Sequence, residues 1–265
     1  MVSSLLSNNK EVVGLFPCKD LTGDQLYELT LQVLELLYKV GYKVFCIISD
    51  NNRINRSMFT RLCGGTLSSK FVSPFDNTHN IFVMFDSVHL FKCIRNNWLN
   101  QIDSKQTFHF PDFIDHNKIL TASVSDLKML QNMEQESVVK LAPALNKKVL
   151  FPTSLERQNV NLCVRLFDQK NVAALKQYQL EHKYSNVEGT ICFVEIVLKW
   201  WKIFNVTHAY KGVRFNDSNC HPITSVDHES ILFLRQFLIW VEKWNNVVVQ
   251  GEGGNIKKKE WQTHI

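Results

Sequence analysis

The sequence predicts a mixed fold, with an α/β arrangement over about the first hundred residues and a mainly helical region after them. Two short runs rich in β-branched and aromatic residues, 42–48 and 81–85, each end on polar residues, as buried strands do. Helical periodicity fills the segments beside these runs. Beyond residue 101, apolar residues recur mostly at steps of three and four, which favours helices packed on helices.

The first predicted helix has signals at both ends. Thr22 is a suitable N-cap, and the acidic Asp24 follows it in the first turn. Apolar residues then recur at helical spacing until Gly41 ends the pattern. The apolar run 12–16 that precedes this helix predicts a short strand.

The next two predicted strands deliver acidic residues at their carboxyl ends. The first leads to Asp50 through a polar turn, and the second leads directly to Asp86. Helices are expected after both strands, over 55–62 and 87–100.

The second half is expected to be helical apart from its start. Residues 101–118 mix phenylalanines with polar residues and Pro111, which predicts a loop or a short irregular element. Apolar periodicity then predicts helices at 125–141, 154–168, 172–180, 190–204 and 230–244. The glycine-containing tail from Val247 predicts an irregular end.

Composition excludes several classes of protein. Of the 265 residues, 45% are hydrophobic, which allows a sizeable core, and the net charge of +5 suits a nucleic-acid partner without requiring one. The seven cysteines form no CxxC pair, so a zinc ribbon is not expected, and they are typical of reduced core residues in an intracellular protein. With no signal peptide and no apolar run of membrane length, the nucleus or the cytoplasm is expected.

Asp50 is the residue best placed for catalysis. Strand carboxyl ends are where α/β proteins collect functional groups, and Mg²⁺ prefers oxygen ligands such as carboxylates. One carboxylate cannot build a two-metal site. From the local sequence alone, Ser49 to Asn52 is more typical of an ordinary polar turn.

The helix after Asp86 carries a second polar constellation. His89, Lys92 and Asn96 lie three and four residues apart and therefore share a helical face that could meet a phosphate. An N-capped helix with a solvated basic side explains the same pattern equally well. No Walker loop, GxGxxG or HExxH motif is present. The tryptophans of the last two predicted helices are expected to pack in the core rather than to stack on bases.

Taken as an ordered set, these segments resemble the P-element and THAP-type DNA transposase family. Five blocks in the family's order carry the resemblance over nearly the whole chain: residues 41–59 around Asp50, the "DxxHLxKxxRN" pattern from Asp86 to Asn96, residues 149–177, Thr190–Asn205 and Phe233–Trp244.

The resemblance implies a ribonuclease-H-like core that cleaves and joins DNA with acidic residues and a divalent metal, Mg²⁺, and an insertion that binds GTP. Asp50 matches the family's second catalytic aspartate and is the implied metal ligand. Asp86, His89, Lys92 and Arg95 match the block where the core meets the insertion and are the implied cofactor-binding residues. Transposon-end DNA is the implied partner, the nucleus the implied location, and an oligomer is possible.

The implied fold is an α/β ribonuclease-H-like partial core over 1–100, a mainly α-helical insertion of the GTP-binding type over 101–205, and the start of the C-terminal part of the core over 206–265. The family's first catalytic aspartate, its last catalytic glutamate and its zinc-binding module are not expected in this chain. It is therefore expected to be a fragment or a domesticated remnant of a transposase, inactive by itself. The alternative is a non-catalytic GTP- or DNA-binding module.

Overall fold

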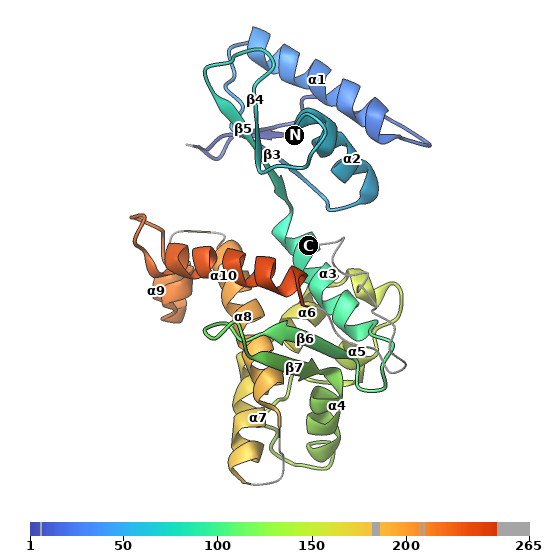
Figure 1. Ribbon diagram of the computed structural model, residues 1–265, viewed down its shortest axis with the longest axis vertical. Coiled ribbons are helices and arrows are strands. Elements are labelled where there is room, and N and C mark those ends of the chain that lie inside the picture. Colours follow the sequence, from blue (N-terminus) through green and yellow to red (C-terminus); the bar gives the residue numbers. More distant parts are fainter. Residues whose placement is uncertain (6, 182–185, 207, 209, 248–265) are drawn as a thin grey trace. The chain divides into compact units, whose positions relative to one another are not determined.

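The computed structural model describes residues 1–5, 7–181, 186–206, 208 and 210–247. They form two compact units that divide between His89 and Leu90, inside the helix α3 (Ser87–Leu99; Figure 1). The first unit is of the α/β type that the sequence predicts. The family-based domain limits at residues 100 and 205 remain predictions.

The first unit begins with the strands β1 (Val2–Ser3) and β2 (Lys10–Glu11), which pair antiparallel. The elements that follow are α1 (Gly23–Lys39), β3 (Cys46–Ser49), α2 (Arg53–Leu62), β4 (Lys70–Val72) and β5 (Asn80–Phe85). The second sheet has the order β3-β5-β4, with β3 parallel and β4 antiparallel to β5. The helices and strands predicted around Asp50 are confirmed.

The strand predicted at 12–16 is wrong, because this segment has no regular structure. Val12 and Leu15 are 66% and 85% exposed, so the run buries little of the apolar surface that would hold a strand against a core. The sequence also missed the short strands β1, β2 and β4, each of which has only two or three residues.

Side chains fix where the two helices of the first unit begin. Thr22 and Gln25 form a capping box: Gln25 N donates to Thr22 Oγ1 at 3.2 Å and Thr22 N donates to Gln25 Oε1 at 2.9 Å. The side chain of Asn52 caps α2 by accepting from Asn55 N at 2.8 Å. The N-cap predicted at Thr22 is confirmed.

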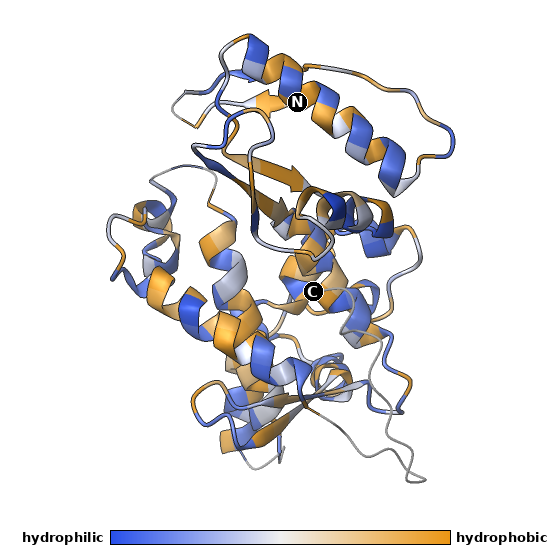
Figure 2. Cartoon of the chain, turned by 45° about the horizontal axis from the view of Figure 1, so that its top comes forward, coloured by the Kyte–Doolittle hydropathy of each residue, from blue (hydrophilic) through white to orange (hydrophobic). Residues whose placement is uncertain are grey.

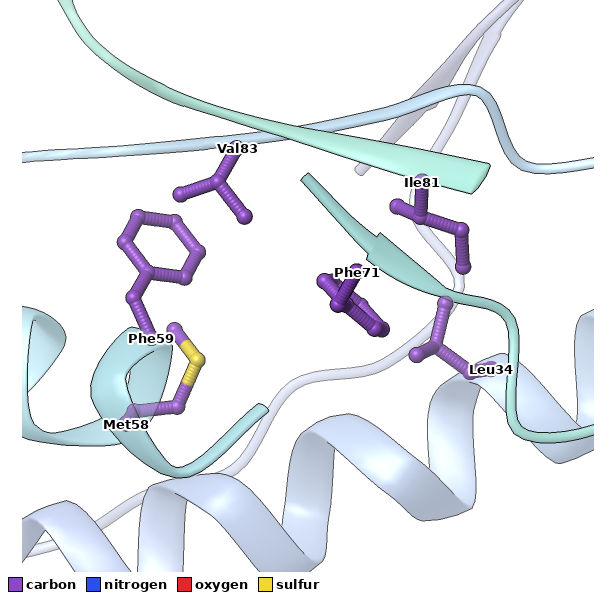
Figure 3. Close-up of a cluster of buried hydrophobic side chains, with 6 residues drawn as sticks. All are labelled: Leu34, Met58, Phe59, Phe71, Ile81 and Val83. Carbon is purple, nitrogen blue, oxygen red and sulfur yellow. The ribbon is translucent and has the colours of Figure 1, made fainter. Parts of the chain in front are cut away.

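One face of the three-stranded sheet packs against α1 and α2. Its core contains six buried side chains, drawn in Figure 3: Leu34, Met58, Phe59, Phe71, Ile81 and Val83. Hydrophobic and hydrophilic residues alternate along α1 (Figure 2), because one side of the helix covers this core while Glu35 and Lys39 form an exposed ion pair at 2.7 Å.

The second unit contains most of α3 and a β-hairpin formed by β6 (Thr107–Pro111) and β7 (Ile119–Ser123). The elements that follow are α4 (Val124–Met133), α5 (Lys147–Leu150), η1 (Glu156–Gln158), α6 (Val160–Leu166), α7 (Gln169–Leu180), α8 (Glu188–Phe204), α9 (Lys211–Phe215), η2 (Ser218–Cys220) and α10 (Glu229–Asn245). The helices predicted at 172–180, 190–204 and 230–244 are confirmed.

Three expectations for the second unit are wrong. The segment 101–118, expected to be irregular, contains β6, in which buried Phe108 and Phe110 lie on one side with the period of a strand. The helix expected at 125–141 ends at Met133, where the buried Glu134 carboxylate accepts from the backbone N–H of Leu141 and Ala142. The helix expected at 154–168 is divided into η1 and α6.

Tryptophans of α10 complete the open edge of the hairpin. Trp240 Nε1 donates to Pro111 O and Trp244 Nε1 donates to His109 O, both at 2.7 Å. These two residues are 1% and 3% exposed, and Trp200 and Trp201 are 7% and 6% exposed. The tryptophans therefore belong to the core, as predicted, and supply donors to strand carbonyls that no third strand pairs among the described residues.

All seven cysteines are free, but the core position expected for them holds only for the buried Cys163 and Cys220, and Cys18 is exposed. Burial raises the pKa of Cys163 and Cys192 to about 11, so both remain thiols at neutral pH. Within the ranges that the structure describes, no helix combines the length and the apolar character needed to cross a bilayer.

Candidate functional site

Asp50 directly follows β3, and Asp86 directly follows β5. Because the parallel pairing places Ser49 opposite Phe85, the two aspartates emerge side by side at the carboxyl edge of the sheet. The strands are held together up to this point, since Asp86 N donates to Ser49 O at 2.9 Å. The sequence predicted both strand ends but not their pairing.

The two carboxylates at this edge are used differently. Asp86 caps α3: its Oδ2 accepts from His89 N at 3.0 Å and its Oδ1 from Val88 N at 3.3 Å. The side chain of Asp50 is exposed, and among the described residues it accepts no hydrogen bond and joins no ion pair. Asp50 is thus the acid that is free to take a ligand.

The backbone around Asp50 is held firmly although its carboxylate is free. Asn55 Nδ2 donates to Asp50 O at 2.9 Å, and Arg56 Nη1 donates to Asn51 Oδ1 at 2.9 Å. Asn51 is only 6% exposed. The sequence assigned no role to these supporting residues, although a cap at Asn52 already places Asn55 and Arg56 on the first turn of α2.

A divalent cation fits this edge in part. The free carboxylate of Asp50 is the hard oxygen donor that Mg²⁺ prefers. Within the described part of the chain, however, no group of three or more histidine, cysteine, aspartate or glutamate side chains is placed to hold a metal. Asp50 could therefore supply one ligand, and a complete two-metal site needs further oxygen ligands.

In the second unit, the polar residues of α3 meet the turn η1. Arg95 is fully buried, and its guanidinium donates to the carbonyl oxygens of Arg157 and Asn159. Burial disfavours the charged form and lowers the pKa of Arg95. Since its donors are directed at backbone carbonyls, Arg95 fastens η1 to α3.

Lys92 and Arg157 form the accessible part of this basic face. Lys92 Nζ lies 3.5 Å from Gln158 Oε1, and Arg157 Nη1 donates to Asn100 Oδ1. Both side chains are half-buried, and neither forms an ion pair with a carboxylate among the described residues. In the sequence Arg157 lies within the matched block 149–177 with no role of its own, and its position beside α3 depends on the contact with Arg95, 62 residues away.

The predicted cofactor-binding residues do not act alike in the structure. Asp86 and His89 are joined through the cap of α3, Arg95 is buried under η1, and Lys92 reaches the accessible side. The assignment of these four residues to nucleotide binding remains a prediction.

Known proteins resemble this chain in sequence. Residues 1–63 match the family model described as "TNP-like, RNase H N-terminal domain". The "Transposable element P transposase" of Drosophila melanogaster is 27% identical over 189 residues, which are 71% of this chain and 23% of that protein. The "DNA transposase THAP9" of Homo sapiens is 25% identical over 237 residues, which are 86% of this chain and 24% of that protein.

A solved structure has the same fold. The "Drosophila P element transposase strand transfer complex" superposes with a TM-score of 0.67 at 21% sequence identity, over 93% of this chain and 50% of that chain. Together these findings show that the chain is similar to transposases with an RNase H-like domain. Among these, it resembles the P-element-type transposases in sequence and in fold, as its ordered blocks predicted. It spans 23% and 24% of the length of the two curated relatives.

Proposed function

We propose that this chain is part of a protein that cleaves and joins DNA in the manner of P-element-type transposases, with Asp50 as one ligand of a divalent metal, Mg²⁺. The observation that carries the proposal is the free carboxylate of Asp50 at the carboxyl end of β3, in a segment that matches an RNase H-like model. Transposon-end DNA is the proposed partner and the nucleus the proposed location. By itself the chain is expected to bind metal weakly and to join no DNA, because Asp50 is the one residue matched to the family's catalytic acids.

Replacing Asp50 by asparagine tests the metal ligand. Mn²⁺, a paramagnetic substitute for Mg²⁺, is expected to broaden the backbone amide NMR signals of residues 49–52 in the wild-type chain. In Asp50→Asn the apparent affinity should fall at least about tenfold, because the amide keeps an oxygen but loses the charge. Asp20→Asn, a change of another exposed aspartate in the same unit, is the matched control and should leave the broadening unchanged. Equal broadening in wild type and Asp50→Asn would refute the assignment.

A second candidate function is non-catalytic binding of GTP or DNA through the basic face of α3. The observation that favours it is that Lys92 on α3 and Arg157, which contacts Asn100 just after α3, are cationic side chains without a carboxylate partner among the described residues. Phosphate oxygens are the natural partners of such a pair. In this second function Lys92 contacts phosphate directly, and the buried Arg95 holds η1 in place beside α3.

Replacing Lys92 by alanine tests whether the basic face of α3 binds GTP or DNA. If the face serves a nucleotide, calorimetry should detect GTP in preference to ATP, with affinity about tenfold lower in Lys92→Ala, since a charged hydrogen bond contributes roughly 1.5–3 kcal/mol. The control is Lys176→Ala, because Lys176 on α7 is already paired with Glu195 at 2.6 Å. Salt-dependent binding of duplex DNA that weakens with the same substitution would instead favour nucleic acid. Absence of both activities at low salt would remove this candidate.

A further inference from the structure

We propose that Arg56 is the positioning residue for Asp50. Its guanidinium holds the residue after Asp50 and the end of the neighbouring strand, and so fixes the direction in which the Asp50 carboxylate projects. The inference rests on the proposed role of Asp50 as a metal ligand. It concerns how the ligand is held, and no motif in the sequence assigned that task to Arg56.

The first contact of Arg56 is with a buried amide. Asn51 is 6% exposed, and its Oδ1 accepts from Arg56 Nη1 at 2.9 Å. A buried amide oxygen needs a donor, and a charged donor gives a stronger bond than a neutral one. Because Asn51 directly follows Asp50, this bond anchors the chain one residue beyond the carboxylate.

The second contact of Arg56 is with the strand next door. The Arg56 guanidinium carbon lies 5.6 Å from the ring centroid of Phe85, the last residue of β5. The Phe85 ring is itself held by Phe59 of the core, with the two ring centroids 5.4 Å apart. Arg56 therefore joins the turn after β3 to the end of β5, where Asp50 and Asp86 leave the sheet.

A third contact completes the support from the same helical turn. Asn55 Nδ2 donates to Asp50 O at 2.9 Å. The backbone of Asp50 is thus held directly by Asn55 and, through Asn51, by Arg56. Supporting residues prepare a metal site by orienting its ligands, and here the two contacts orient Asp50 through its backbone.

A positioning role and a simple charge effect predict opposite results. Among the described residues Arg56 forms no ion pair with a carboxylate. If Arg56 acted only through its charge, removing it would strengthen Mn²⁺ binding at Asp50, because one repelling cation would be gone. If Arg56 positions Asp50, removing it weakens Mn²⁺ binding despite the lost repulsion.

The experiment compares Arg56→Met, Arg56→Lys and Arg61→Met in the full chain, with Mn²⁺ as the probe. Arg61 is a matched control, because it lies on the same helix, contacts the ring of Tyr27 at 4.4 Å and pairs with Asp24 at 2.7 Å. Arg56→Met should lower the apparent Mn²⁺ affinity about tenfold, as loss of a supporting residue typically does. Arg56→Lys, which keeps the charge and a donor, should restore most of it, and Arg61→Met should behave as wild type.

A metal-free measurement separates this inference from the proposed function. The amide order parameters of residues 50–52 should fall in Arg56→Met from about 0.85 towards 0.6 and stay unchanged in Arg61→Met. Wild-type order parameters or unweakened Mn²⁺ binding in Arg56→Met would overturn the inference. If Mn²⁺ does not broaden the signals of residues 49–52 even in the wild-type chain, the proposed metal role of Asp50 is refuted. The order parameters alone then test whether Arg56 holds the turn after β3. Should Arg56→Met not fold, Arg56→Gln provides the same comparison with a polar side chain.

Discussion

Replacing Gly189 by alanine is expected to destabilise the second unit by about 3 kcal/mol or more, because the added methyl group has no space. A Cβ at this position would lie 2.1 Å from Thr121 O and 2.7 Å from Thr121 C, both of them backbone atoms of β7. The clash cannot be relieved by rotating a side chain. It occurs where α8 is fastened to the hairpin, since Ser123 N donates to Thr190 Oγ1 at 2.9 Å.

Denaturant unfolding followed by tryptophan fluorescence measures this effect selectively. The five tryptophans among the described residues lie beyond the division at His89, so their emission reports on the second unit. The matched control is Glu188→Ala, an exposed neighbour on the first turn of α8, for which a change of less than about 1 kcal/mol is expected. If the unfolding curve of Gly189→Ala had the same denaturant midpoint and the same slope as that of the wild-type chain, α8 would not pack against β7 at this distance.

The parts of the fold that the sequence predicted have local signals. The helix α1 carries its cap, its apolar stripe and its terminating glycine within twenty residues, and each signal needs no information from the rest of the chain. The strands β3 and β5 are continuous apolar runs, which made them recognisable, although only one side of β5 is covered: Phe82 and Met84 on the other side are 49% and 42% exposed. Asp50 could be placed because a strand and its following turn are adjacent in sequence.

The parts that were missed depend on distant residues. The edge carbonyls of β6 are satisfied by the indoles of Trp240 and Trp244, 129 and 135 residues away. The sequence near β6 does not indicate that such donors exist, and Pro111 is a residue that disfavours a strand. The early end of α4 likewise depends on the Glu134 carboxylate, which binds the backbone of Leu141 and Ala142.

The candidate site also combines features with local sequence signals and features that depend on distant residues. The sequence identified Asp50, but the support by Arg56 requires the register that brings Phe85 beside the turn. Arg95 was among the cofactor-binding residues that the family resemblance implied, yet it lies four residues after Phe91 and three before Trp98 on the buried stripe of α3. That spacing was visible in the sequence, and applying it to a charged residue would have predicted the burial.

Replacing Trp98 by alanine is expected to destabilise the second unit by roughly 3–5 kcal/mol, the usual range for removing a large buried aromatic side chain. Trp98 is 0% exposed and packs edge-on against Phe193, with ring centroids 4.9 Å apart. It also stacks near Phe108 and Phe167 at 6.2 and 6.0 Å. The cavity would therefore open between α3, the hairpin and α8, which cannot all close onto the same space.

Two phenylalanine variants separate packing from hydrogen bonding in this core. Trp98 Nε1 finds no acceptor among the described residues, so Trp98→Phe removes volume only and should cost less than half as much as Trp98→Ala. Trp240→Phe removes a donor to Pro111 O as well, and the buried carbonyl left unpaired adds about 1–3 kcal/mol. The free energy of unfolding is measured by denaturant unfolding followed by circular dichroism at 222 nm. Trp98→Ala should be the most destabilised variant, Trp240→Phe the next and Trp98→Phe the least. Equal losses in the two phenylalanine variants would mean that the indole of Trp240 contributes volume alone, and that the edge of β6 is satisfied in another way.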